Sequence, residues 1–157
     1  MQKNENEAMI AALNSLITIN NDRYEGYNTA AKESKDPDLD QQFFESANKS
    51  KMYVSKLSQY VRELGGEPAE GTTNSGKLYR IWMDVKSAIA MKDRAAVLSN
   101  CEFGEDAALK AYEEVKEIDD LHFPADYIST INSQEAEIRL DHDRIKVMRD
   151  VEVESNN

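Results

Sequence analysis

The sequence predicts an all-α protein, folded as one four-helix bundle. Five segments carry apolar residues three and four positions apart, which is the spacing of one face of an α-helix. The six glycines and three prolines lie mostly between these segments. With 157 residues the chain has the length of a single domain that can bury a substantial core. We therefore expect one domain over residues 1–157, with a frayed tail at 152–157.

The first two predicted helices are long and are separated by only a few residues. The first runs from about Asn4 to Glu33, and its inward seam consists of Ile10, Leu13, Ile17, Asn20, Tyr24, Tyr27 and Ala31. Asp36-Pro37 opens the second helix, because Asp36 can cap it and a proline costs no hydrogen bond in the first turn. Gly65-Gly66 is a typical helix end.

The remaining three helices follow a loop rich in Gly, Glu and Thr that ends near Ser75. A shorter amphipathic helix carries Leu78, Ile81, Trp82, Val85 and Ile89 on one side. Asp93 can cap the next long helix, and the last helix begins near Pro124.

Connection lengths predict the order in which the helices pack. The short links at Ser34–Pro37 and Asp119–Phe123 each favour an antiparallel hairpin. Roughly 30 residues separate the second and third long helices, which is enough chain to cross the length of the bundle. We expect two hairpins joined by a long crossover, with the short extra helix lying along it.

Composition excludes several classes of function. The chain is acidic, with a net charge of −11, so we expect no nucleic acid as a partner. No apolar run approaches the roughly 20 residues of a membrane span, and the N-terminus lacks the order of a signal peptide. Cys101 is the only cysteine, which fits a reducing, cytoplasmic location.

Each long seam is interrupted by a polar residue near the middle of its helix. These four residues, predicted to meet in one buried layer, are Asn20, Ser50, Glu105 and Glu135. A buried carboxylate needs hydrogen bonds, a shared proton or a cation. Two interpretations follow: a polar layer that fixes the register of the helices, or a single metal ion held by Glu105 and Glu135 with help from Asn20.

Other side chains are candidates for the surroundings of this layer. The residues that could support it are Tyr27, Tyr53, Tyr112 and His142. We expect His142 to be a hydrogen-bonded core histidine and Glu102 to lie at the boundary of the layer. Cys101 is expected to be an unreactive buried thiol. A ligand cavity among Tyr24, Tyr53 and Tyr112 is a further interpretation.

Several sequence motifs together resemble a known family. They are LNSLITINNDRYEGY in the first helix, Asp36-Pro37, LGGEP at 64–68, CEFGEDAALKAYEE from Cys101, and HDRIKVMRD near the end. The combination, which spans nearly the whole chain, resembles a family of bacterial ferritin-like four-helix-bundle proteins, a domain of unknown function. This resemblance implies the ferritin-like arrangement of two hairpins.

The resemblance also implies where a di-iron centre would lie. Ferritin-like enzymes place a Glu on each of two helices and Glu-x-x-His on each of the other two. Asn20 and Glu105 match the single-Glu positions, whereas Ser50-x-x-Tyr53 and Glu135-x-x-Ile138 match the Glu-x-x-His positions. Both histidines and two carboxylates are thus replaced, and His142 lies about 10 Å beyond Glu135 along the helix. We expect a degenerate di-iron site.

These observations predict a non-enzymatic helical protein. By analogy with ferritin-like relatives we expect a stress-related role through self-association as a homo-oligomer or through binding of an unidentified protein partner. We expect no cofactor. The alternative is a metalloprotein whose reduced carboxylate site, Glu105 with Glu135, binds one metal ion of unspecified identity.

Overall fold

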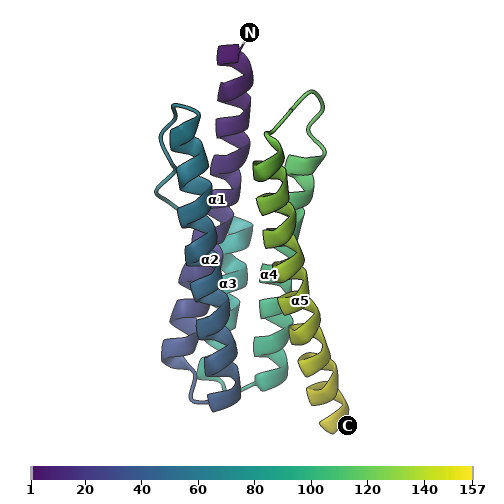
Figure 1. The fold of residues 1–157 in the computed structure, drawn as a ribbon. Coiled ribbons are helices and arrows are strands. Elements are labelled where there is room, and N and C mark those ends of the chain that lie inside the picture. Colours follow the sequence, from purple (N-terminus) through teal and green to yellow (C-terminus); the bar gives the residue numbers. More distant parts are fainter. Residues whose placement is uncertain (1, 157) are drawn as a thin grey trace.

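The computed structural model describes residues 2–156, with side chains from residue 4 onward, and in this range it contains five helices and no strand. The helices are α1 (Gln2–Glu33), α2 (Pro37–Glu63), α3 (Gly76–Ala90), α4 (Arg94–Lys116) and α5 (Ala125–Ser155) (Figure 1). The predicted all-α class is confirmed. No helix in the described part of the chain is both long and apolar enough to cross a membrane.

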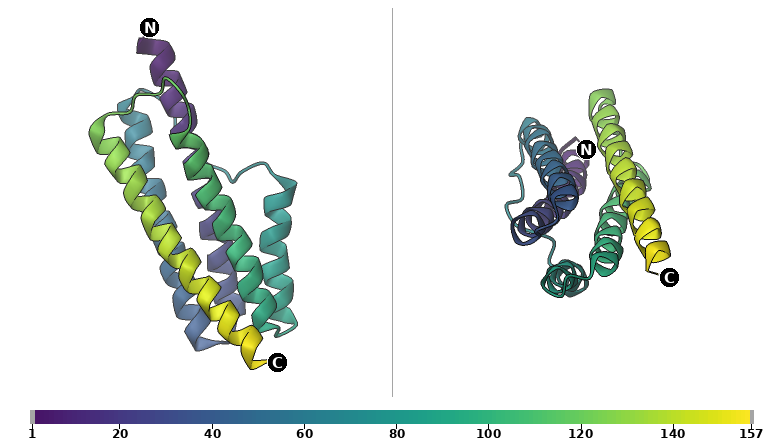
Figure 2. Two further views of the ribbon diagram at one scale, coloured as in Figure 1. Left: turned by 90° about the vertical axis from the view of Figure 1, so that its right-hand side faces the viewer. Right: turned by 90° about the horizontal axis from the view of Figure 1, so that it is seen from below.

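The four long helices lie side by side, and the short helix α3 lies outside them. In Figure 1, α1 and α5 run downward while α2 and α4 run upward, so each hairpin is antiparallel. The connection from α2 returns along the length of the molecule, and α3 forms its lower part. Figure 2 shows α3 beside α1 and α4, away from α5.

Local sequence signals determine where the helices begin and end. The Asp36 carboxylate accepts hydrogen bonds from the backbone N–H groups of Asp38 and Leu39. Asp93 caps α4 in the same way. Gly65 ends α2 with a positive φ of 88°, which a glycine adopts without steric strain, and the Gly66 N–H donates to the Val61 carbonyl at 2.9 Å.

The C-terminal helix α5 extends into the tail at 152–157. Fraying was expected over residues 152–157, but α5 remains helical through Ser155, and Glu152 pairs with Arg94 of α4. Asn157 lies outside the described residues. The added turn of α5 therefore rests partly on an ion pair with the start of α4.

The hydrophobic core consists of two clusters stacked along the helix axes. The first contains Leu13, Ile17, Leu57, Tyr112 and Ile138, among others. The second contains Tyr27, Phe43, Leu98, Cys101 and Ile145, among others. On each long helix, the residues between the two clusters include buried polar side chains. The core is therefore divided by a polar layer at mid-height.

Two glycines inside helices allow α3 to pack closely. A Cβ atom added at Gly26 of α1 would lie 2.3 Å from the Trp82 ring, and one at Gly104 of α4 would lie 2.6 Å from it. Real Cβ atoms do not approach other atoms this closely, so only glycine leaves room for the indole. Trp82 also makes an edge contact with Tyr27, with ring centroids 5.0 Å apart. The indole thus anchors α3 against α1 and α4.

Candidate functional site

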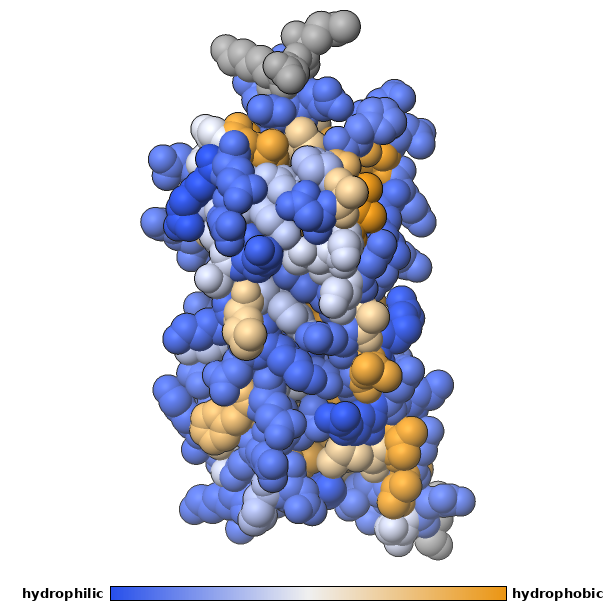
Figure 3. All heavy atoms as spheres, viewed as in Figure 1, coloured by the Kyte–Doolittle hydropathy of each residue, from blue (hydrophilic) through white to orange (hydrophobic). Residues whose placement is uncertain are grey.

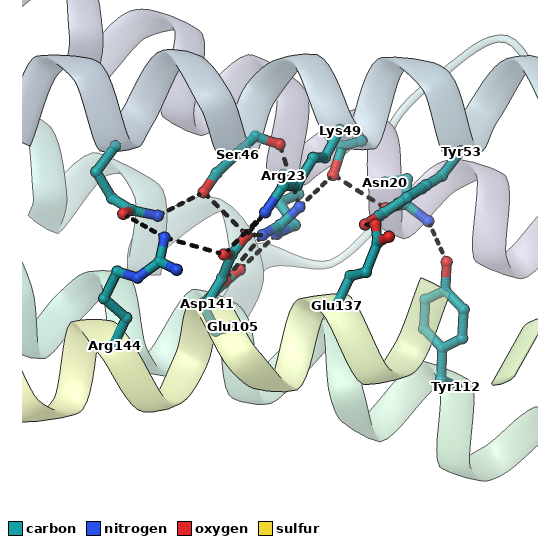
Figure 4. A network of polar contacts seen from close by, with 12 residues as sticks. Asn20, Arg23, Ser46, Lys49, Tyr53, Glu105, Tyr112, Glu137, Asp141 and Arg144 are labelled. Carbon is teal, nitrogen blue, oxygen red and sulfur yellow. Dashed lines mark hydrogen bonds and ion pairs between the residues drawn. The ribbon is translucent and has the colours of Figure 1, made fainter. Parts of the chain in front are cut away.

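A guanidinium group occupies the centre of the polar layer. The Arg23 side chain, from α1, is only 1% exposed. Its Nε and Nη2 atoms donate to the two carboxylate oxygens of Glu105 on α4, at 2.6 and 2.9 Å. Nη2 also donates to Oδ2 of Asp141 on α5, at 2.8 Å (Figure 4). One arginine therefore joins three of the four long helices by charged hydrogen bonds.

The remaining donors of Arg23 are bound by the fourth long helix. Nη1 donates to the Ser46 carbonyl oxygen at 3.1 Å and to the Ser50 hydroxyl at 2.9 Å, both on α2. These contacts bring the total to five hydrogen bonds, equal to the five N–H groups of a guanidinium. Each N–H can thus have its own acceptor, which is what a buried cation requires.

Neutral side chains extend the network toward the first core cluster. The Ser50 hydroxyl donates to Oδ1 of Asn20 at 3.0 Å, and Nδ2 of Asn20 donates to the Tyr112 hydroxyl at 2.8 Å. The Tyr112 hydroxyl in turn donates to Oε1 of Gln134 at 2.7 Å. The chain of donors and acceptors therefore runs from α2 through α1 and α4 to α5.

Asp141 receives further partners on the side where α2 faces α5. The Ser46 hydroxyl lies 3.2 Å from its Oδ2, and Nζ of Lys49 lies 3.1 Å from its Oδ1. The Lys49 side chain is 34% exposed, so it connects the layer with solvent. Arg23 and Lys49 supply positive charges to the two carboxylates, Glu105 and Asp141, and Nη1 of the exposed Arg144 lies 3.8 Å from Oδ1 of Asp141. Both carboxylates are therefore paired with cations of the protein itself.

Burial and ion pairing shift the pKa values of this site in opposite directions. Burial raises the pKa of the Glu105 carboxyl above its ordinary value, and the adjacent Arg23 opposes that shift. For Arg23, burial is the largest single effect and lowers the pKa, but the charge and hydrogen bonds of Glu105, together with Tyr27 and Asp141, raise the pKa overall. The Arg23 guanidinium is consequently held in its protonated form. Arg23 is thus a fixed positive charge that lies against the carboxylates of Glu105 and Asp141.

Tyr27 lies against this charge on the side of the second core cluster. Its ring centroid is 5.4 Å from Cζ of Arg23, a cation–π distance. Burial raises the pKa of the Tyr27 hydroxyl well above its ordinary value, and this hydroxyl has no hydrogen-bond partner among the described residues. The Tyr27 ring therefore covers the guanidinium, while the Tyr27 hydroxyl makes no hydrogen bond to the network.

The structure brings three of the four predicted layer residues together. Asn20, Ser50 and Glu105 all belong to the Arg23 network. Glu135 lies outside it: its Oε1 pairs with Lys116, and its Oε2 has no partner among the described residues. The second carboxylate at Arg23 is Asp141, six residues later and about 9 Å farther along α5.

Of the residues predicted to surround the layer, only some belong to the Arg23 network. Tyr112 is part of the network, whereas the Tyr53 hydroxyl donates to Glu137 on α5. His142, expected to be a hydrogen-bonded core histidine, lies between α4 and α5 at the edge of the core, with its side chain 15% exposed and Nε2 2.8 Å from Oδ1 of Asp106. The reason is that Asp141, its neighbour, takes the inward direction on α5. Cys101 is fully buried, and burial raises the pKa of its thiol, as expected for an unreactive cysteine.

Sequence reasoning missed the two residues that complete the centre. Arg23 and Asp141 are charged, and neither was among the predicted layer residues. Arg23 nevertheless lies three residues after Asn20 and four before Tyr27, so it shares their helix face. A buried Glu105 needs a cation, and this requirement was the signal that could have identified Arg23.

The fold and the site define an all-helical protein whose centre is a closed network of ion pairs. The chain belongs to the family described as a domain of unknown function (DUF2383), whose sequence profile matches residues 8–117. The matched part includes Arg23, Ser50 and Glu105 but ends before Asp141. No curated protein matches the chain.

Proposed function

We propose that this chain is a bacterial, cytoplasmic protein with the ferritin-like four-helix-bundle arrangement but without catalytic activity. In this proposal Arg23 takes the position that metal ions occupy in ferritin-like enzymes. The protein then acts in a stress response by self-association or by binding a protein partner. The stress-related part rests on analogy with ferritin-like proteins alone.

The course of the chain supports the ferritin-like arrangement. Two antiparallel hairpins, α1 with α2 and α4 with α5, are joined by the connection that contains α3 (Figures 1 and 2). Ferritin-like bundles share this single long crossover and carry their metal ligands on inward faces at mid-height. The Arg23 network lies at the corresponding level, between the two core clusters.

The hydrogen bonds of Arg23 are the main support for the proposal that the core has no catalytic metal. Both oxygens of Glu105 are engaged by this guanidinium. A metal ion on Glu105 would have to displace Arg23 and would leave a second positive charge buried beside the first. Breaking a buried ion pair in this way costs about 3–5 kcal/mol. The arginine therefore competes directly with any metal.

Elemental analysis tests this proposal. Tag-free protein, purified without chelator from cells grown with iron, manganese and zinc, is compared with Glu105→Ala and with Glu113→Ala, a control at an exposed position of α4. We expect no metal whose stoichiometry depends on Glu105. Stoichiometric metal that is lost in Glu105→Ala and retained in Glu113→Ala would contradict the proposal and favour the alternative, a metal ion bound by Glu105.

The surface of α5 supports the proposal of self-association. Leu140, Val147 and Val151 are 64%, 61% and 57% exposed, and their spacing of seven and four residues places them on one helix face. Figure 3 shows hydrophobic atoms at the lower right, where this part of α5 runs. An apolar stripe of this kind favours pairing with a similar stripe on a second copy.

Sedimentation equilibrium tests this second element of the proposal. We expect the wild-type protein to self-associate and Val147→Glu to shift the equilibrium toward the monomer. Met52→Glu, at a 71% exposed position of α2, is the matched control and should behave like wild type. Monomeric wild-type protein at all concentrations, or equal behaviour of both variants, would contradict self-association through this face.

A further inference from the structure

Three possible metal ligands meet at the surface between α4 and α5. Glu102 and Asp106 are one turn apart on α4, and His142 faces them from α5. Nε2 of His142 lies 2.8 Å from Oδ1 of Asp106 and 3.5 Å from Oε2 of Glu102. One ligand atom from each residue lies within 4.8 Å of the other two.

Both ring nitrogens of His142 lie close to carboxylate oxygens. Its Nδ1 lies 3.0 Å from Oδ1 of Asp143, so both ring nitrogens face carboxylates. A neutral imidazole has only one N–H group. If Nδ1 donates to Asp143, the lone pair of Nε2 points at the oxygens of Asp106 and Glu102. Either a second proton or a metal ion must then lie between Nε2 and these oxygens.

Neighbouring residues hold the ligands in orientations that suit a metal. Metal-binding histidines usually donate their other N–H to a carboxylate or carbonyl, and Asp143 is such an acceptor for His142. Arg149 contacts Oε1 of Glu102, which leaves Oε2 directed toward His142. Both the histidine and the glutamate are therefore oriented by partners outside the cluster.

We propose that Glu102, Asp106 and His142 bind one divalent transition-metal ion, for which Zn²⁺ is the probe. Metal–ligand bonds of about 2.1 Å in a tetrahedral site place ligand atoms roughly 3.4 Å apart. The separation of 3.5 Å between His142 and Glu102 already has this value. Asp106 is 54% exposed and free to move outward by the few tenths of an ångström that its shorter contact requires.

The chemistry of the ligands defines the class of ion. An imidazole together with two carboxylates suits zinc, manganese or iron, whereas magnesium and calcium prefer oxygen ligands alone. Three protein ligands leave a fourth position for water. This site is separate from the Arg23 network, since Glu105 points to Arg23 while Glu102 and Asp106 face His142.

Zinc titration followed by calorimetry tests the proposal on tag-free protein freed of metal by dialysis against chelator. The chain has only two histidines, so the exposed loop residue His122 provides the matched control. We expect one equivalent of Zn²⁺ to bind to the wild type and to His122→Ala. Saturable binding should be lost in His142→Ala and in Asp106→Asn.

Two further measurements separate metal binding from a structural role. Asp143→Asn keeps all three ligands and should weaken zinc binding about 10–100-fold without changing the thermal midpoint of the metal-free protein. Co²⁺ should produce visible absorption bands of a low-symmetry site that Zn²⁺ abolishes. The absence of saturable zinc binding to the wild type, or its retention in both His142→Ala and Asp106→Asn, would overturn the proposal in favour of a protonated histidine. Neither result would bear on the Arg23 network.

Discussion

Replacing Arg23 by methionine should be among the most destabilising single changes in this protein. The substitution retains the length of the side chain but removes all five hydrogen bonds that the guanidinium makes. Glu105 is then left as a fully buried carboxylate without its cation. Removing one partner of a buried ion pair costs about 3–5 kcal/mol, a large share of the 5–15 kcal/mol that stabilises a typical domain.

Urea unfolding followed by circular dichroism measures this loss of free energy. Thermal unfolding checks it independently: for a chain of this size, a loss of about 3–5 kcal/mol corresponds to a decrease of roughly 6–20 °C in the thermal midpoint. Arg139→Met, at an exposed position of α5, is the matched control and should change stability by no more than about 0.5 kcal/mol. If the free energy of unfolding of Arg23→Met lay within about 0.5 kcal/mol of the wild-type value, the account of the centre would be refuted.

A double-mutant cycle identifies the cause of the loss. In Arg23→Met combined with Glu105→Met, the carboxylate that lacks a cation is also removed, while Asp141 keeps Lys49 and Ser46. We expect the double variant to be more stable than the sum of the single effects predicts, by roughly 1–3 kcal/mol. Strictly additive effects would show that Arg23 and Glu105 do not depend on each other.

Two other predictions follow from buried groups. Gly26→Ala should destabilise the protein by about 1–3 kcal/mol despite the higher helix propensity of alanine, because its Cβ would lie 2.3 Å from Trp82. Urea unfolding beside Gly76→Ala, where the nearest atom is 3.8 Å away, checks this, and a stabilised Gly26→Ala would contradict it. Burial raises the pKa of the Cys101 thiol, so the unfolded chain loses this proton first, and stability should fall as pH rises above about 9. The free energy of unfolding should fall by about 1.4 kcal/mol per pH unit, and Cys101→Ala should lack this fall between pH 9 and 10. The same fall in Cys101→Ala would show that the Cys101 thiol does not cause it.

The helices were predictable because their signals are local. Apolar spacing, the caps at Asp36 and Asp93 and the glycines after α2 depend on neighbours a few residues away. Short links fixed the two hairpins for a similar reason. The end of α5 was harder to predict, because the pairing of Glu152 with Arg94 depends on a residue far away in the sequence.

The candidate site was only partly predictable, because helical spacing assigns a face by hydropathy. Asn20, Ser50 and Glu105 were found since they interrupt apolar seams. Arg23 has the hydropathy of a surface residue, and only its acceptors from α2, α4 and α5 make its burial favourable. Asp141 was missed for the same reason, and because Asp141 points inward, His142 lies at the edge of the core between α4 and α5.

The most direct test of an arginine-centred core is anomalous diffraction from crystals of the wild-type protein grown with excess iron or manganese. We predict that the Arg23 guanidinium lies between Glu105 and Asp141 and that no anomalous peak lies within bonding distance of Glu105. A metal peak on the Glu105 carboxylate, with Arg23 turned away from it, would contradict the central claim.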